Sequence, residues 1–233
     1  MSDFPSILKH IPAHITPKTV EEMERIRRQS QPSVDHTASL RSVIGEIRGV
    51  GARFKQCRLE NYRSHTQAQA DAVSTLQRWI ESVNQGLDTN LVLAGYRGAG
   101  KTHLATAVMF ALSDLGLSSE IISFHDLILE IRSTYRSSTT QSEWQIFQRL
   151  AQSDVLVVDD LDKSRHSASE QQTLQTIIDR RYRNQMPTVL ITPLPGQAFC
   201  SLVGDVVLTR LRHGQLVWIE CAWGDDHSTS SRK

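Results

Sequence analysis

The sequence lacks the features that mark secreted, disulfide-bonded or membrane proteins. Its 233 residues include only three cysteines, Cys57, Cys200 and Cys221, which lie far apart and show no C-x-x-C spacing. We therefore expect buried reduced thiols rather than a structural zinc or a disulfide framework. No apolar run is long enough to cross a bilayer, and residues 1–5 show no basic segment followed by an apolar core. These absences predict a cytoplasmic protein with no membrane partner.

An excess of charge of one sign is also lacking. Lysine and arginine number 26 against 25 acidic residues, which gives a formal net charge of +1 with histidine neutral. This balance neither requires nor excludes a nucleic-acid partner, so any basic binding surface has to be local. The nine histidines show no metal-ligand spacing. The length suffices for one α/β domain and a smaller appendage.

The strongest pattern present is G-x-x-x-x-G-K-T at residues 95–102. A short apolar run at residues 90–94 precedes it, and an Ala- and Leu-rich segment at 103–112 follows it. A strand, a glycine turn and a helix in this order direct backbone N–H groups and the positive helix end at one point, which suits the triphosphate of ATP. The alternative is a chance match in a glycine-containing turn. The candidate nucleotide-binding residues are Gly95, Tyr96, Arg97, Gly98, Ala99, Gly100, Lys101, Thr102 and His103.

A second pattern is the apolar run at residues 155–158, which ends in Asp159 and Asp160. A continuous β-branched run indicates a strand buried on both faces of a parallel sheet. Acids at its end lie at the sheet edge where ligands bind in open α/β folds. Asp159 is expected to hold Mg²⁺ together with Thr102, and Asp160 to orient or deprotonate the attacking water. The alternative is a pair of acids that only cap a following helix.

The remaining apolar patterns predict an α/β fold with a central parallel sheet flanked by helices, plus a small helical N-terminal domain. Further strands are expected at 120–124, 188–192 and 216–221, and helices at 73–83, 126–135, 142–152 and 169–184. Apolar stripes at 4–11, 19–26 and 40–47 predict three short helices whose apolar faces need a partner. They either pack on the main domain or dock on another protein. The expected division is a helical region at 1–50, an ATPase domain at 51–223 and a polar tail at 224–233.

Segments outside the glycine turn carry a resemblance to a known family. They are residues 11–15 (IPAHI), 57–63 (CRLENYR), 100–105 (GKTHLA), 177–181 (IIDRR), 210–212 (RLR) and 216–218 (LVW). Through them the chain resembles, along nearly its whole length, the DnaC-type bacterial replicative helicase loaders, which are AAA+ ATPases related to the replication initiator. The resemblance implies that the N-terminal helices grip the hexameric replicative DNA helicase. It also implies a AAA+ core that binds ATP and Mg²⁺, self-associates, and holds single-stranded DNA while the helicase ring is opened.

The resemblance also assigns roles to single residues. Lys101 and Thr102 match the Walker A lysine and hydroxyl, and Asp159 matches the metal-holding Walker B acid. Asp160 stands where many AAA+ proteins have a glutamate, and a shorter acid reaches less far, so hydrolysis is expected to be slow. Stimulation of hydrolysis by single-stranded DNA is a further expectation. Arg210 matches the arginine finger, which would contact in trans the γ-phosphate bound by a neighbouring subunit. Its role there would be to neutralise charge on the transferred phosphoryl group.

Two positions depart from the family pattern. The polar sensor residue expected after the fourth strand falls on Pro193, which has no side-chain donor. Thr192 is a candidate substitute. The second-sensor arginine falls on His227, which is largely neutral at pH 7. Both departures put nucleotide sensing by this chain in question.

The family contacts single-stranded DNA through the helical insert after the second strand, where Arg132 and Tyr135 match and Arg136 is adjacent. A cation for phosphate and a ring for base stacking suit sequence-tolerant binding. The alternative is a solvated helix face with one tyrosine packed on the core. The cluster Arg180, Arg181 and Arg183 is equally ambiguous, because the last turn of any helix favours cations.

Three other functions remain open at this point. A transposition-helper ATPase of the IstB type would keep the same core but prefer duplex DNA. A P-loop kinase would act on a small acceptor as a monomer and turn over without DNA. A binding module would use ATP only as a conformational ligand, and Asp160, Pro193 and His227 favour that reading slightly.

Overall fold

The computed structural model describes residues 44–135, 141–163 and 167–223. The helices expected at 4–11 and 19–26, Arg136, His227 and the polar tail lie outside the described residues. The compact unit that contains the described residues begins at Ser42. None of its described helices is both long and apolar enough to cross a membrane. All three cysteines are free, with Cys57 and Cys221 buried and Cys200 partly exposed.

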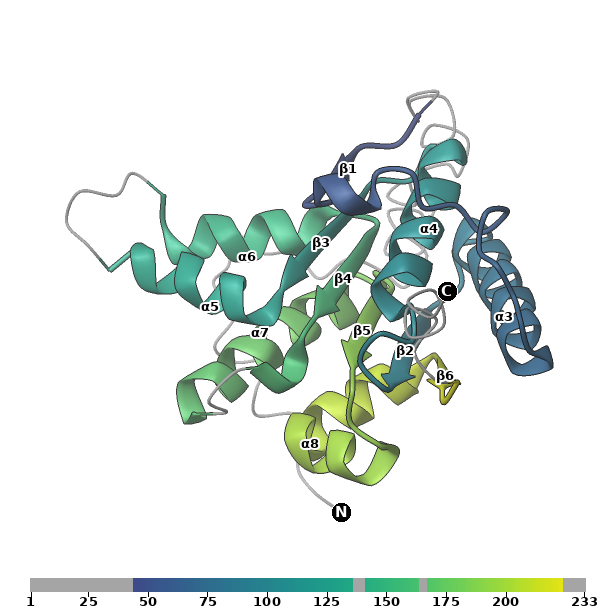
Figure 1. The fold of residues 1–233 in the computed structure, drawn as a ribbon. Helices are drawn as coiled ribbons and strands as arrows, with labels where there is room; N and C mark the ends of the chain where they lie inside the picture. Colours follow the sequence, from purple (N-terminus) through teal and green to yellow (C-terminus); the bar gives the residue numbers. More distant parts are fainter. Residues whose placement is uncertain (1–43, 136–140, 164–166, 224–233) are drawn as a thin grey trace, which may run out of the picture. The chain divides into compact units, whose positions relative to one another are not determined.

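In the described part of the chain, six parallel strands form the central sheet (Figure 1). They are β1 (Ile47–Arg48), β2 (Thr89–Gly95), β3 (Ser119–Ser123), β4 (Val155–Asp159), β5 (Thr188–Thr192) and β6 (Gln215–Cys221). Their order across the sheet is β1-β3-β4-β5-β2-β6. The central parallel sheet and the five longer strands predicted from the sequence are therefore confirmed.

The two phosphate-site strands, β2 and β4, lie on either side of β5. Leu93 pairs with Ile191 of β5, and Val158 of β4 pairs with Leu190 of the same strand. Because all three strands run the same way, the carboxyl ends of β2 and β4 emerge at one edge of the sheet. Their central residues are buried on both faces, as continuous apolar strands of a parallel sheet require.

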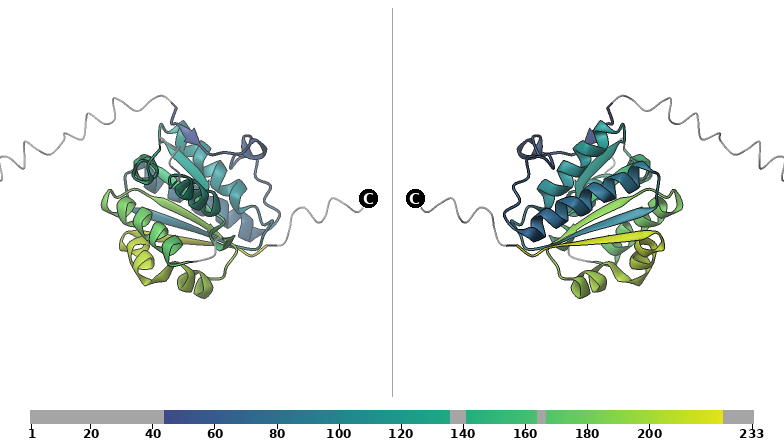
Figure 2. Two further views of the ribbon diagram at one scale, coloured as in Figure 1. Left: turned by 90° about the vertical axis from the view of Figure 1, so that its left-hand side faces the viewer. Right: turned by 90° about the vertical axis from the view of Figure 1, so that its right-hand side faces the viewer.

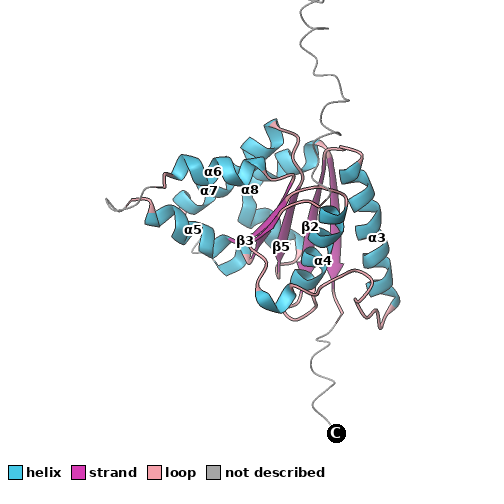
Figure 3. Ribbon diagram, turned by 90° about the horizontal axis from the view of Figure 1, so that it is seen from above, coloured by secondary structure: helices cyan, strands magenta, loops and turns pink. Residues whose placement is uncertain are grey.

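Helices cover both faces of this sheet (Figure 2, Figure 3). One face packs against α3 (Gln67–Asn84) and α4 (Lys101–Asp114). The other packs against α5 (Phe124–Ser133), α6 (Glu143–Gln152), α7 (Ala168–Arg183) and α8 (Gly196–His213). Two single 3₁₀ turns, η2 (Ala52–Phe54) and η3 (Leu161–Lys163), lie in the connections. The result is a three-layer α/β arrangement.

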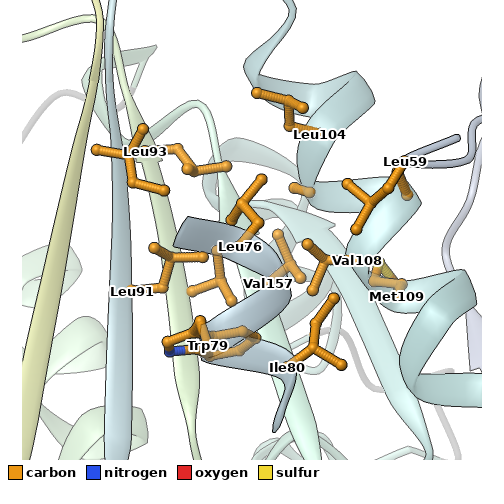
Figure 4. Close-up of a cluster of buried hydrophobic side chains, with 14 of the residues drawn as sticks. Leu59, Leu76, Trp79, Ile80, Leu91, Leu93, Leu104, Val108, Met109 and Val157 are labelled. Atoms are coloured by element: carbon orange, nitrogen blue, oxygen red, sulfur yellow. The ribbon is translucent and has the colours of Figure 1, made fainter. Parts of the chain in front are cut away.

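Buried apolar side chains fill the core between α3, α4 and the sheet (Figure 4). Trp79 of α3 is almost fully buried, and Leu104 of α4 is completely buried one turn after the glycine motif. Large side chains interlock here without exposed edges, so α4 cannot shift relative to β2 without opening cavities. The labelled members are Leu59, Leu76, Trp79, Ile80, Leu91, Leu93, Leu104, Val108, Met109 and Val157.

The prediction of a third N-terminal helix from the apolar stripe at 40–47 is wrong at the C-terminal end of that stripe. Ile47 and Arg48 form β1 and pair with Ser119 and Glu120 of β3. Gly45 explains the difference, because its backbone bonds to Ser113 at the end of α4, and a β-carbon there would lie 2.0 Å from the Leu117 carbonyl oxygen. The residues assigned to the region 1–50 thus include one strand of the sheet.

A buried guanidinium joins α7 to the sheet and to α6. Arg181 is only 1% exposed and donates to the carbonyl oxygens of Leu150, Ser153, Asp154 and Pro187 and to the Thr188 hydroxyl. Burial lowers the pKa of Arg181 to about 9. Of the three arginines that the sequence left ambiguous, Arg181 is therefore a structural cross-link and is inaccessible to DNA.

Replacing Arg181 with methionine should reduce the free energy of unfolding by about 3 kcal/mol, because several buried carbonyl groups lose their donors. The matched change Arg180→Met removes a guanidinium that lies 5.2 Å from the Phe147 ring centroid. It should cost about 1 kcal/mol or less. Urea unfolding of both variants measures the difference, and equal costs would contradict the structural role of Arg181.

Candidate nucleotide-binding site

The glycine turn between β2 and α4 adopts a conformation that only glycine favours. Gly98 and Gly100 have φ angles of 85° and 86°, and Gly100 is the residue that caps the start of α4. Successive amides in such a turn, followed by the unpaired N–H groups of a helix start, form a concave anion-binding surface. The turn therefore has the backbone geometry that a phosphate chain requires.

Lys101 lies inside this turn rather than in solvent. Its Nζ donates to the carbonyl oxygens of Gly95 and Tyr96, each at 2.7 Å, and the residue is 8% exposed. Burial lowers the pKa of Lys101. The ammonium group is thus held at the mouth of the turn, where phosphate oxygens would replace the two carbonyl groups as its partners.

Thr102 and Asp159 are brought into direct contact. The Thr102 hydroxyl donates to Asp159 Oδ2 at 2.8 Å, and the backbone N–H of Asp160 donates to Asp159 Oδ1 at 2.7 Å. Burial raises the pKa of Asp159, and these two hydrogen bonds oppose that rise. A hydroxyl and a carboxylate converge beside the glycine turn, which is the hard oxygen donor set that Mg²⁺ prefers. The residues present therefore fit a magnesium–triphosphate group.

Asp160 lies at the same edge but is engaged by a neighbour. Its φ angle is 56°, in the left-handed region, and its carboxylate forms an ion pair with Lys163 of η3. A second ion pair joins Arg97 of the glycine turn to Asp162. The segment after β4 is therefore tied to the turn by charge, and the candidate water-activating acid is not free.

A cavity of about 870 Å³ opens beside the turn. Besides the glycine turn and both acids, it is lined by residues from the segment 53–65, including Asn61, Tyr62 and His65. The Tyr62 ring would lie 3.4 Å from a β-carbon at Gly100, and it meets the His103 ring edge-on at 5.5 Å. The sequence analysis gave residues 57–63 only as part of the family resemblance and did not assign them to the nucleotide site.

The last strand also supports the turn, which sequence reasoning missed. Trp223 follows β6, is 8% exposed, and donates from Nε1 to the Ala99 carbonyl oxygen at 2.8 Å. A β-carbon on Gly95 would lie 2.2 Å from the Cys221 carbonyl oxygen, so β6 approaches the turn closely. The buried indole thus fixes the middle of the turn from one side.

The sensor position after β5 is occupied by Pro193, next to the candidate substitute Thr192. Pro193 lines the cavity and offers no donor there. Thr192 is fully buried, and its hydroxyl accepts the Leu194 N–H at 3.2 Å. Thr192 is not among the residues that line the cavity, and its role as a substitute for the polar sensor stays a prediction.

Arg210 lies away from the cavity, near the end of α8. The next residue, Leu211, accepts a hydrogen bond from Asn90 at the start of β2, and Gln215 bonds to Asp88 just before that strand. Asn90 and Gly95 are five strand residues apart, or roughly 16 Å. Arg210 is therefore at the opposite edge of the sheet from the glycine turn of its own chain.

The candidate DNA-binding residues lie on the α5–α6 side. Arg132 pairs with Glu170 at 3.0 Å, and Glu170 is the buried acid of the capping box that starts α7. Tyr135 is 70% exposed, and its hydroxyl donates to Glu143 at 3.3 Å. Tyr135 is thus not packed on the core, whereas Arg132 already has a structural partner.

Comparisons with known proteins agree with this geometry. The family model described as "IstB-like ATP binding protein" matches residues 41–217. The replicative helicase loader DnaC of Escherichia coli strain K12 is 29% identical over 97% of this chain and 94% of the relative. The crystal structure of the DnaC helicase loader superposes with a TM-score of 0.64 and 24% identity, covering 72% of this chain and 99% of that one. The structure of AMPPCP-bound DnaA from Aquifex aeolicus superposes with a TM-score of 0.59 and 23% identity, covering 71% of this chain and 50% of that one.

These matches confirm the AAA+ P-loop fold and the resemblance to DnaC-type loaders that the sequence indicated. The family model spans β1 to the first residues of β6 and so includes the glycine turn, both acids and Arg210.

Replacing Asp159 with asparagine should stabilise the nucleotide-free protein while weakening magnesium-dependent ATP binding. Burial raises the pKa of Asp159 above its usual 3.8, so the folded wild type is penalised for the charged form. The gain in stability should be absent below about pH 3.8, grow as the pH rises through the folded-state pKa, and stay constant above it.

Thermal unfolding across a pH series checks this stability change, and calorimetry should show binding weakened by about tenfold, or roughly 1.4 kcal/mol. Asp114→Asn, which changes an exposed acid at the end of α4, is the control and should alter neither measurement. A destabilised Asp159→Asn protein at pH 7 would contradict the burial argument.

Proposed function

Because this chain belongs to the IstB-like ATP-binding family, we propose that it is an ATP-dependent loader of a replicative DNA helicase. One observation carries the proposal: Lys101, Thr102 and Asp159 converge at a glycine turn in a chain that is similar to a helicase loader over 97% of its length. The first two residues come from the start of α4 and the third from the end of β4. ATP binding is thereby coupled to the relative position of these two elements.

Different residues of the site would bind different parts of the nucleotide. The backbone N–H groups of the turn and of the α4 start would bind the phosphates, and Lys101 would exchange its two carbonyl partners for the β- and γ-phosphates. A bound Mg²⁺ ion, held by Thr102 and Asp159, would neutralise charge on the phosphate oxygens. Tyr62 and His65 line the same cavity and would enclose the remainder of the nucleotide.

Hydrolysis by this site is proposed to be slow. Asp160 is a shorter acid than glutamate, and Lys163 already neutralises its carboxylate. The cavity-lining Pro193 offers no donor to a γ-phosphate. We propose that single-stranded DNA stimulates turnover, since a change near η3 would be needed to release Asp160.

Arg210 is proposed to act on the nucleotide of a neighbouring copy. It lies at the opposite sheet edge from its own glycine turn, so it cannot reach its own γ-phosphate without unfolding α8. Copies arranged head to tail would place one chain's Arg210 beside the next chain's turn. Self-association through the ATPase domain follows from this arrangement.

The N-terminal region, residues 1–50, is proposed to bind the hexameric helicase, and the α5–α6 insert to hold single-stranded DNA. Tyr135 is exposed and can stack on a base, while Arg132 would bind phosphate if it exchanged Glu170 for it. Arg136, outside the described residues, would add a second cation. ATP binding would then govern how the chain grips the ring.

The helicase assignment predicts that deletion of residues 1–41 abolishes capture of the replicative helicase but leaves ATP binding intact. The deletion stops before Ser42, where the compact unit with the ATP site begins. A pull-down with purified helicase and a parallel nucleotide-binding assay measure both properties. Capture by the truncated chain as strong as by the full chain would exclude the assignment.

A transposition helper of the IstB type is the second candidate, since the matching family model is described as an IstB-like ATP binding protein. Its DNA preference separates the two functions. A loader should bind single-stranded DNA more tightly than duplex at every salt concentration of a titration series. Clear duplex preference would favour the transposition helper.

For the loader, Tyr135→Ala should weaken single-strand binding by about tenfold, as expected for one lost stacking contact. Leu129→Ala, which truncates an exposed side chain of α5, the helix that ends just before Tyr135, is the matched control and should have little effect. The same preparations should show ATP hydrolysis that rises when single-stranded DNA is added. Equal binding by both variants and wild type would contradict the role of Tyr135.

A further inference from the structure

The segment 177–181 contains one residue, Asp179, that belongs neither to the buried core nor to the lining of the nucleotide cavity. Ile177, Ile178 and Arg181 are buried, and Arg180 lies over the Phe147 ring. Asp179 instead lies at the surface of α7 beside the end of α8. Its Oδ1 accepts a hydrogen bond from Arg210 Nε at 2.9 Å.

This contact engages one particular nitrogen of the guanidinium group. Nε is the inner nitrogen, so bonding to it leaves the two terminal nitrogens without a hydrogen-bond partner among the described residues. The terminal pair is the fork that binds phosphate oxygens bidentately. The contact therefore orients the guanidinium group and keeps its phosphate-binding side available.

An aromatic ring restricts the same group from a second direction. The Arg210 guanidinium carbon lies 4.8 Å from the Tyr182 ring centroid, and Tyr182 in turn meets the His213 ring edge-on at 5.0 Å. Asp179 and Tyr182 are three residues apart on α7 and so share one face of that helix. A long, partly exposed side chain is thus held by two contacts from one rigid element.

We infer that Asp179 is a positioning residue for Arg210, which it holds so that the terminal nitrogens face the γ-phosphate bound by a neighbouring copy of this chain. The inference rests on the proposed function, because it requires Arg210 to act in trans. Asp179 itself touches neither nucleotide nor metal. Its loss should therefore lower the turnover number and leave the KM for ATP unchanged.

Mixed subunits test this separately from the folding of α7. A donor subunit carries Lys101→Ala, so it offers Arg210 but cannot use its own turn. An acceptor subunit carries Arg210→Ala, so it binds ATP but offers no arginine. Each alone should be nearly inactive, and mixing them should restore ATP turnover.

Adding Asp179→Asn to the donor should lower the restored turnover number by about fivefold, the order expected for losing one partly exposed charged contact. Adding the same change to the acceptor should have no effect, since Arg210 is already absent there. Asp179→Glu in the donor should recover part of the loss, because the carboxylate is kept. Asp114→Asn in the donor, which removes the same charge from an exposed position, should match the unmodified mixture.

The outcomes distinguish the positioning role of Asp179 from the action of Arg210 in trans. Equal losses when Asp179→Asn is placed in either subunit indicate a folding defect and overturn the inference, as does no loss in the donor. No rescue by the unmodified mixture at any ratio overturns the action of Arg210 in trans, and the inference with it. Nucleotide and helicase binding by the wild-type chain would be unaffected by either result.

Discussion

The hydrogen bond from Thr102 to Asp159 is the contact on which the candidate site depends. It joins the start of α4 to the end of β4, two segments 57 positions apart in the chain. The contact is possible because β2 and β4 run parallel with only β5 between them, so both end at the same sheet edge. Cores on both faces hold these strands in register. If β4 were reversed, Asp159 would lie at the opposite edge, and the glycine turn would have no carboxylate beside it.

The same parallel arrangement gives the domain two functionally different edges. The carboxyl edge carries the turn, the acids and the cavity, whereas the amino edge carries the end of α8 with Arg210. A site that needs groups from both edges cannot be completed within one copy, because β2 separates them by its own length. The proposed action of Arg210 in trans therefore requires head-to-tail association rather than a two-fold dimer, in which each surface would meet an identical one.

The sequence predicted those parts of the structure that local patterns determine. The strand–turn–helix at 89–114 and the buried strand before Asp159 follow from apolar runs and from glycines that the turn needs. The sequence did not predict the features that depend on contacts between residues far apart in the chain. β1 has only two residues and exists because Gly45 lets the chain approach α4. α8 went unpredicted because it begins without a side-chain cap and is broken at Gly204. The burial of Arg181 and the contact of Trp223 with Ala99 also depend on partners distant in sequence.

The two ion pairs beside the turn connect nucleotide binding to the state of Asp160. Lys163 neutralises Asp160, and Arg97 neutralises Asp162; both cations line the cavity into which the phosphates would enter. A triphosphate carries more negative charge than either single carboxylate, so it would compete with both acids for these cations. Drawing Lys163 toward the phosphate would be one part of the change near η3 that the release of Asp160 requires. Because this part of the change needs a bound nucleotide, water activation by Asp160 would be restricted to the nucleotide-loaded protein.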